Sequence, residues 1–449
     1  MRAPLEVADV FRDGEARFLS EYGHMLSREQ RQVLRAVIRC RTAQLGGHVV
    51  QQCDDCGHQR IQYNSCRNRH CPKCQAMARA VWLEKRESEL LPVPYFHVVF
   101  TLPHELGPLA LQNKRVVYGI LFRAAAQTLL EIAADPKYLG AKIGCLMVLH
   151  TWGQNLQAHP HIHCIVPGGG LSSDGKNWVG SRENFFLSVK VLSRLYRGLF
   201  VSRLRTAYEN DELEFHGRLA ELAKPKRFDR LLRELSDIEW VVYAKRPFGG
   251  PKQVVSYLGR YTHRVAISNH RLVSDEGGKV RFRWKDYRRA KSDNESGTSI
   301  MELDAHEFIR RFLLHVLPRG FVRIRRYGLL ANRKRGGKLA KCRELLGTSP
   351  GPPIVLGWET LFENLTGRSA TSCRHCQHGQ LTKVREIPSF KDLLERLGPR
   401  VGLYLPSLRL SRILGAHYLE KVRLLESALP SSPAANRPIP NGLPKLDTS

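Results

Sequence analysis

The spacing of apolar residues predicts helices and strands that alternate without a regular strand–helix–strand rhythm. Within residues 27–45, apolar positions recur at helical spacing, and Ser27 with Gln30 matches a capping box. Gly46 and Gly47 end this helix. Similar patterns predict helices over residues 75–91, 110–134, 185–236 and 253–267, and in EFIRRFLLHVLP from Glu307.

Short runs rich in β-branched residues predict strands between these helices. They are HVVFTLP (97–103), CLMVLH (145–150), HIHCIVP (161–167) and WVVYAK (240–245). Residues 271–284 match a hairpin with Glu276, Gly277 and Gly278 at its turn. This irregular mixture favours an α+β fold in which helices flank an antiparallel sheet.

The chain of 449 residues is too long for one ordinary hydrophobic core. Pro92 and Pro94 break it after the second predicted helix, so we expect a first domain at 1–93. A sheet-containing domain should occupy 94–300, and a basic, mainly helical region 301–428. The tail at 429–449 is rich in Pro and Ser, as disordered segments are.

The charge of the chain narrows the partner. Lys and Arg number 71 against 42 Asp and Glu, which gives a net charge of +29. Such a balance indicates a polyanionic partner, and nucleic acid is favoured over a membrane because we see no run that approaches the length of a membrane span. The N-terminus shows no apolar signal core, so we expect a cytoplasmic protein with reduced thiols.

Cysteine and histidine are dense between residues 40 and 74. Cys53–Cys56 and Cys71–Cys74 form two CxxC pairs 14 residues apart, and four thiolates at this spacing can close a tetrahedron around a structural zinc ion. Four nearby residues are candidates for a second site: Cys40, His48, Cys66 and His70. The alternative for the two histidines is a position at the surface or against DNA.

A third CxxC pair, Cys373–Cys376, lies far along the chain with His375 and His378 beside it. It is a candidate for a further small metal site, with Cys342 as an outside ligand. The alternative, spare thiols, is equally consistent with the sequence.

Histidines alternate in the run HPHIHCIVPGGG. In a strand, residues two apart share one face, so His161 and His163 project together while Ile162 points into the core. Two neighbouring imidazoles suit a divalent metal ion. The alternative is a pair of ordinary cross-strand polar contacts.

Two tyrosines, Tyr257 and Tyr261, lie four residues apart in a predicted helix and therefore on one face. An aromatic core stripe is the usual reason for such a pair. Here the neighbours are polar and basic, including Arg260 and Arg264, and nearby Val and Leu residues supply a separate apolar face. This favours a chemical role for the tyrosines.

These residues carry a family resemblance. HPHIHCIVPGGG followed by YLGRYTHRVAI resembles the HUH endonuclease superfamily, in its two-tyrosine, rolling-circle transposase branch, the insertion sequence 91 family. Four further blocks resemble that family in its order: SCRNRHCPKCQ, YFHVVFTLP, WVVYAKRPFGGP and LPRGFVRIRRYGLLANR. The resemblance covers most of the chain and implies an HUH-type antiparallel sheet with a two-tyrosine site at 94–300.

The resemblance also implies the chemistry. Mg²⁺ or Mn²⁺ held by His161 and His163 would stabilise charge on the scissile phosphate of single-stranded DNA. Tyr257 or Tyr261 would attack phosphorus to give a 5′-phosphotyrosine link that conserves the bond for rejoining. A third ligand is expected, with Gln154 as first choice. The alternatives are Gln157 and His263, and His159 is a candidate to support the ligands from behind.

The segment from Arg319 to Arg343 holds ten Lys or Arg and no acidic residue, with Phe321 and Tyr327 interleaved. This pattern favours contact with single-stranded DNA over a solvated helix face. The residues we expect to bind DNA are Lys245, Arg323, Arg325, Arg326, Arg333, Lys334 and Arg335.

The expected partners are single-stranded DNA at transposon ends and target DNA. No GxxxxGK[ST] motif is present, so host replication or helicase functions would supply any unwinding. Two other interpretations stay open: a plasmid replication initiator or relaxase with the same chemistry, and a non-catalytic zinc-ribbon protein that binds nucleic acid.

Overall fold

A computed structural model describes residues 5–45, 47–87, 89–182, 186–245, 253–254, 259, 266–285, 297–333, 335–349 and 356–385. The chain divides into two compact units. The first comprises residues 1–35 and 68–367, and the second residues 36–67 and 368–449. The predicted division at residues 93, 300 and 428 stays a prediction.

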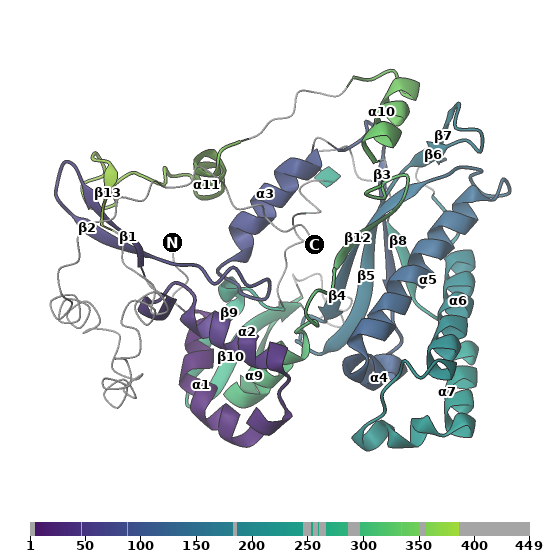
Figure 1. Ribbon diagram of the computed structural model, residues 1–449, viewed down its shortest axis with the longest axis horizontal. Helices are drawn as coiled ribbons and strands as arrows, with labels where there is room; N and C mark the ends of the chain where they lie inside the picture. Colours follow the sequence, from purple (N-terminus) through teal and green to yellow (C-terminus); the bar gives the residue numbers. More distant parts are fainter. Residues whose placement is uncertain are drawn as a thin grey trace, which may run out of the picture. The chain divides into compact units, whose positions relative to one another are not determined.

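A five-stranded sheet is the centre of the first unit (Figure 1). Its strand order is β12-β4-β5-β3-β8, and every neighbouring pair is antiparallel. The strands are β3 (Tyr95–Thr101), β4 (Gly144–Trp152), β5 (Ala158–Pro167), β8 (Val242–Lys245) and β12 (Ile324–Gly328). The four predicted strands are therefore confirmed, and so is the α+β class with an antiparallel sheet.

Alternation along these strands separates two faces. Phe100, Leu149 and Ile162 turn to one face and are buried in the main hydrophobic core. Helices α5 and α6 supply much of the rest of that core and lie beside the sheet in Figure 1. The helices on this side are α4 (Gly107–Gln112), α5 (Lys114–Ala134), α6 (Val189–Glu209) and α7 (Pro225–Asp237).

Helix α5 alone, among the helices of the described residues, is long and apolar enough to cross a membrane. This finding corrects the expectation that no run approaches the length of a membrane span. In the fold, 72% of the most apolar window of α5 is buried inside the protein. Its apolar residues pack against the sheet, which is the usual position of a core helix.

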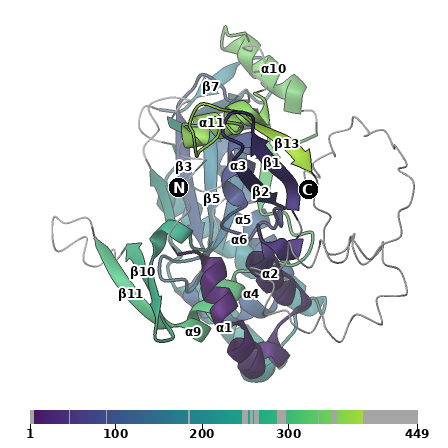
Figure 2. The same cartoon turned by 90° about the vertical axis from the view of Figure 1, so that its left-hand side faces the viewer.

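A second antiparallel sheet of the first unit has the order β11-β10-β9 and projects at one side in Figure 2. Its strands are β9 (Leu272–Glu276), β10 (Lys279–Lys285) and β11 (Thr298–Asp304). The predicted hairpin is confirmed, because β9 and β10 pair in antiparallel register on either side of Gly277 and Gly278. Both glycines have positive φ, as a two-residue hairpin turn requires. Helices α1 (Val7–Tyr22) and α9 (Ala305–Leu314) pack together through Phe11 and Phe312, whose rings lie 5.0 Å apart.

The capping box predicted for the helix after residue 27 is present. The Ser27 backbone N–H donates to Gln30 Oε1 at 2.9 Å, and the Gln30 N–H donates to Ser27 Oγ at 3.2 Å. The remaining described elements of helical type are α2 (Arg28–Arg39), α3 (Gln75–Glu87), α10 (Arg335–Leu345), α11 (Trp358–Thr366) and the short 3-10 turns Gly23–Met25, Ala43–Leu45, His104–Leu106, Gly217–Ala223 and Asn269–Arg271. Strands β6 (Gly169–Leu171) and β7 (Trp178–Gly180) form a small ribbon.

The second unit contains a three-stranded antiparallel sheet of order β13-β1-β2. A hairpin of β1 (Gly47–Cys53) and β2 (Gln59–Tyr63) pairs with β13 (Leu381–Arg385). Strand β13 comes from more than 300 residues further along the chain. This long-range pairing was not predicted.

Candidate metal centres

Three histidines gather on the face of the five-stranded sheet opposite the main core. His161 and His163 lie on β5, and His150 on β4 lies directly opposite His161 in the antiparallel register. Since directly paired residues share a face, all three side chains project together. The shared face of His161 and His163 agrees with the sequence analysis, whereas His150 was missed.

The three imidazoles are close enough to serve one cation. Each offers a ring nitrogen, and these three nitrogens lie within 4.8 Å of one another. The ring centroids are 4.8 Å apart for His161 and His163, and 4.5 Å apart for His150 and His163. His150 and His163 are buried and His161 is half-buried, so the site is open on one side. Three nitrogen ligands with an open side suit Mn²⁺, Zn²⁺ or Co²⁺ better than Mg²⁺.

Hydrogen bonds orient two of the rings. His161 Nδ1 lies 2.6 Å from the carbonyl oxygen of His159, which can only accept, so Nδ1 carries the proton and Nε2 has the lone pair. His163 Nδ1 lies 2.8 Å from His97 Nε2, and the two rings stack with centroids 5.1 Å apart. His163 can therefore donate from Nδ1 to His97 and keep Nε2 for a metal ion.

His97 is suited to accept that hydrogen bond. Burial lowers its pKa to about 3, and the nearby positive charge of Lys245 and His161 acts in the same direction. His97 is therefore neutral at physiological pH. Lys245 pairs with His97 across β3 and β8, and its side chain is exposed. Lys245, which we predict to contact DNA, therefore lies on an edge strand of the sheet that carries the histidines.

The residues predicted as the third ligand have other contacts. Gln154 lies in the turn between β4 and β5, where its carbonyl oxygen accepts from the Arg271 guanidinium at 2.5 Å. Gln157 Oε1 accepts from Asn155 Nδ2 at 2.9 Å. His159 supplies the carbonyl that orients His161. His263 lies outside the described residues. These contacts leave the assignment of Gln154 a prediction, and His150 is the alternative that the strand register supplies.

The two tyrosines, Tyr257 and Tyr261, also lie outside the described residues, together with most of the predicted helix 253–267. Val254, just before them, is described and fully buried. It packs in a cluster with Leu146 and Ile165, which pair across β4 and β5 on the same face as the histidines. Ile165 lies two residues from His163 on that face.

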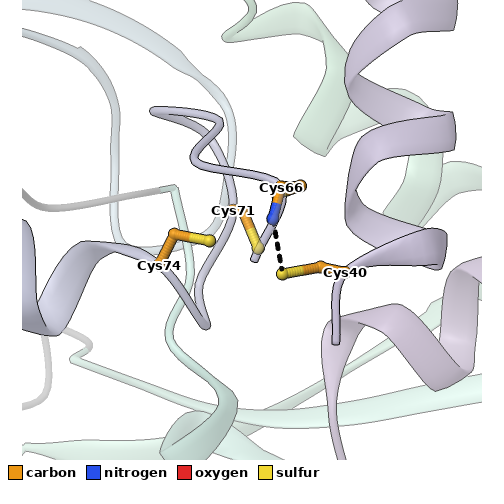
Figure 3. Close-up of side chains that lie close together, drawn as sticks. All are labelled: Cys40, Cys66, Cys71 and Cys74. Carbon is orange, nitrogen blue, oxygen red and sulfur yellow. Dashed lines mark hydrogen bonds between the residues drawn. The ribbon is translucent and has the colours of Figure 1, made fainter. Parts of the chain in front are cut away.

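Cysteines form two clusters, and each cluster contains one N-terminal CxxC pair. Cys40, Cys66, Cys71 and Cys74 form the first, with sulfur atoms within 4.8 Å of one another (Figure 3). The Cys66 backbone N–H donates to Cys40 Sγ at 3.5 Å. The second cluster unites Cys53 and Cys56 with Cys373 and Cys376.

This grouping corrects the one expected from spacing. Cys53 and Cys56 lie at the turn of the β1–β2 hairpin, whereas Cys71 and Cys74 precede α3, so the two pairs take different partners. Cys40 and Cys66 join the latter pair. His70 does not, because its Nε2 accepts from the Leu317 N–H at 3.5 Å. Burial and Arg69 hold the pKa of His70 well below its ordinary value. The side chain of His48 lies outside the described residues.

The predicted DNA-binding arginines differ in exposure. Arg323 is only 9% exposed, and burial lowers its pKa to about 10, which is a correction because a buried side chain cannot reach a DNA backbone. Arg326 and Arg335 form ion pairs with Glu89. Arg333 is exposed, and Lys334 lies outside the described residues.

Arg325 lies in a surface groove of about 460 Å³ with two unpredicted arginines, Arg115 and Arg123. Its guanidinium stacks 4.3 Å from the ring centre of Phe122 and 5.1 Å from that of Phe321. Within the described residues, none of the three arginines forms an ion pair with a carboxylate. Their charges are therefore available to a polyanion.

Across the described residues, the fold and these clusters define an α+β protein with one candidate histidine centre and two candidate cysteine centres. Comparison with known proteins gives the family. Residues 10–102 match the "Transposase zinc-binding domain" model, and residues 144–337 match the model described as "Putative transposase". The chain belongs to the insertion sequence 91 family of transposases.

Two relatives support this membership. The "Putative transposase y4qJ" of Sinorhizobium fredii is 54% identical over 387 residues, which are 85% of this chain and 96% of the relative. The "Transposase for insertion sequence element IS801" of Pseudomonas savastanoi pv. phaseolicola is 31% identical over 319 residues, 70% of this chain and 74% of the relative. No solved structure matches the chain.

Proposed function

We propose that this transposase cuts and rejoins single-stranded DNA through a metal-dependent 5′-phosphotyrosine intermediate. The observation that carries the proposal is the set His150, His161 and His163 on one open sheet face, within the segment that matches the transposase model. A divalent cation bound there would offset the negative charge that develops on the scissile phosphate. Mn²⁺ fits the all-nitrogen ligands better than Mg²⁺.

The protein's own groups have separate tasks in this proposal. The His159 carbonyl and His97 orient the rings of His161 and His163 through their Nδ1 atoms, so that each Nε2 would serve as a ligand of a bound cation. The Tyr257 or Tyr261 hydroxyl loses its proton and attacks phosphorus, and the 3′-oxygen leaves and takes up a proton as a 3′-OH. Attack of a 3′-OH on the phosphotyrosine restores a phosphodiester and releases the tyrosine.

Val254 supports the placement of the nucleophile. It is buried against Leu146 and Ile165 on the histidine face, and Tyr257 follows it by three residues. Three residues of chain span at most about 11 Å. A buried Val254 on the histidine face therefore supports our assignment of the following tyrosines to this centre.

The test uses the full chain, Mn²⁺ and single-stranded oligonucleotides that tile the DNA flanking the coding sequence. A covalent protein–DNA adduct should persist on a denaturing gel. Changing both Tyr257→Phe and Tyr261→Phe should abolish it, while the control Tyr138→Phe, in the turn after α5, should leave it unchanged. An adduct that survives the double change would overturn the tyrosine assignment, and no adduct with any oligonucleotide would overturn the nuclease.

The groove of Arg115, Arg123 and Arg325 supports a second part of the proposal, namely that it binds the DNA backbone. Stacking on Phe122 and Phe321 fixes the Arg325 guanidinium and lowers the entropic cost of binding a phosphate. If each arginine neutralises one phosphate, Arg115→Ala and Arg123→Ala should each lower the slope of log affinity against log salt by about 1. Arg230→Ala, on α7 beside Glu234, is the control. An unchanged slope would show that the groove does not bind the DNA backbone.

The relaxase and replication-initiator interpretation also predicts a covalent protein–DNA adduct, but it predicts a different DNA product. A transposase should transfer the bound strand to a second DNA molecule, whereas an initiator should leave a primer at one origin. The zinc-ribbon interpretation predicts DNA binding without any adduct. The two transposase relatives favour the first outcome.

A further inference from the structure

The sulfur atoms of Cys53, Cys56, Cys373 and Cys376 all lie within 4.8 Å of one another. The Cys53 and Cys376 sulfur atoms are 3.6 Å apart, and those of Cys56 and Cys373 are 3.8 Å apart. Zinc–sulfur bonds of about 2.3 Å in a tetrahedral site place the sulfur atoms about 3.8 Å from each other. A disulfide would need about 2.05 Å, so these separations indicate ligands around one ion and exclude a sulfur–sulfur bond.

The backbone around the two pairs repeats the same turn. The residue after each second cysteine has a left-handed conformation, with φ of 69° at both Gly57 and Gln377. In each pair, backbone N–H groups point at the first sulfur atom: Cys56 N lies 3.5 Å from Cys53 Sγ, and His375 N lies 3.4 Å from Cys373 Sγ. Such N–H groups stabilise thiolates. A left-handed backbone conformation is energetically unfavourable for a non-glycine residue such as Gln377, so other interactions must compensate for it.

The strands bring the two turns close together. Cys53 pairs with Leu381 in the β1–β13 register, and the Gln380 N–H donates to Asp54 Oδ1 at 2.7 Å. A Cβ at Gly379 would overlap Cys53 Sγ and lie 2.7 Å from Asp55 Cβ, so only glycine allows this approach. The rings of His58 and His375 stack 4.9 Å apart beside the cluster.

Among the residues that the structure describes, little apolar packing surrounds this site. The buried cluster here consists of Cys53, Cys373 and Leu381, with Cys376 packed against it. A core of this size cannot stabilise a fold in water, and small domains of this kind rely on a metal ion or disulfides. We therefore expect metal ligation by the four thiolates to be the main interaction that holds β13 to the β1–β2 hairpin.

We infer that Cys53, Cys56, Cys373 and Cys376 bind a second structural zinc ion, and that this zinc site joins the N-terminal hairpin to a segment 317 residues further along the chain. The site is closed by four protein ligands and has no open position for chemistry. The family zinc-binding model ends at residue 102, so half of this site lies outside it. The β13-β1-β2 sheet is then folded only when the segment that carries Cys373 and Cys376 is present and metal is bound.

Zinc content tests the inference without any DNA cleavage. We expect one zinc ion at each of the two cysteine clusters, so Cys373→Ser with Cys376→Ser should lower the total zinc content of the full chain by one. The control Cys342→Ala, at a buried cysteine outside both clusters, should leave the zinc content unchanged. If the double variant keeps the zinc content of the wild type, the inference is wrong, because Cys53 and Cys56 would then bind their zinc without the C-terminal pair.

A measurement on the unmodified protein covers the case in which the variant does not fold. The four cysteines should be protected from alkylation together in the zinc-loaded protein, and should become reactive together during chelator treatment, as read by peptide mass spectrometry. Alkylation of Cys373 and Cys376 while Cys53 and Cys56 stay protected would overturn the shared site. Both readouts are independent of whether the histidine centre cleaves DNA.

Discussion

The histidine centre and the second cysteine cluster are held in place by different means. The histidines lie on a five-stranded sheet whose opposite face is buried in the main core, so their geometry exists before any ion binds. Within the described residues, Cys53, Cys56, Cys373 and Cys376 have only a small hydrophobic cluster behind them. In the first site the fold positions the ligands, whereas in the second, by our inference, metal binding stabilises the fold.

Zinc removal should give the largest effect and should separate the two regions. Structural zinc contributes on the order of 10 kcal/mol or more to the folding of small domains. A strong chelator should therefore unfold β1 and β13 while β4 and β5 stay folded. Among these four strands, hydrogen exchange by mass spectrometry should show fast amides only at 47–53 and 381–385. Equal loss of protection in both sheets would contradict the difference in mechanism.

Substitution at the histidine centre should instead lower DNA cleavage and leave the fold intact. His150→Ala should lower DNA cleavage on the order of 10²- to 10³-fold, as expected when an electrostatic interaction with the reacting phosphate is removed. The melting temperature should change little. Gln154→Ala is the matched comparison and should lower cleavage less than about tenfold. A larger decrease with Gln154→Ala would make Gln154 the third ligand and His150 a neighbour.

His97 offers a finer test of the prebuilt geometry. His97→Phe keeps a ring beside His163 and removes the acceptor of its Nδ1 proton. Removing such a supporting partner weakens metal affinity about 10- to 100-fold. Mn²⁺ titration followed by electron paramagnetic resonance measures the affinity, with exposed His104→Phe as control. An unchanged affinity would show that the hydrogen bond does not orient His163.

The first unit should also be sensitive to acid. His315 is fully enclosed, bonded to Thr151 Oγ1 and the Leu156 carbonyl, and burial lowers its pKa to about 4. The unfolded chain binds this proton near pH 6.5, so stability is full above that pH and falls as pH drops toward 4. The expected decrease in the free energy of unfolding is about 2 kcal/mol between pH 7 and pH 5.

Urea unfolding at a series of pH values checks this decrease. His315→Gln should flatten the pH dependence, and His216→Gln, at an exposed histidine, should not. An unchanged slope in His315→Gln would assign the acid sensitivity to other groups, such as His70.

Local periodicity was enough to predict some parts of these sites. Alternation in HIHCIVP indicated the shared face of His161 and His163, and the apolar runs indicated β3, β4 and β8. His150 was missed because its place depends on the pairing register of β4 and β5, which the irregular turn at residues 153–157 sets. The partners of Cys53 and Cys56 were missed because strand β13 pairs with β1 across most of the chain, and spacing carries no information about such pairing.

Arg323 shows the same limit for charge. A run of basic residues predicts side chains exposed at the surface. In the fold, side chains of β12 alternate between the two faces of the sheet, and Arg323, just before this strand, is buried. Composition alone could not separate it from Arg325, which lies in the groove.

The measurement that tests the central claim most directly is mass spectrometry of the protein–DNA adduct after proteolysis. With Mn²⁺ and single-stranded DNA, we expect the nucleotide on a peptide that contains Tyr257 or Tyr261, and we expect His161→Ala to form no adduct while keeping its fold. Attachment at any other residue, or an adduct of equal yield in His161→Ala, would contradict the account.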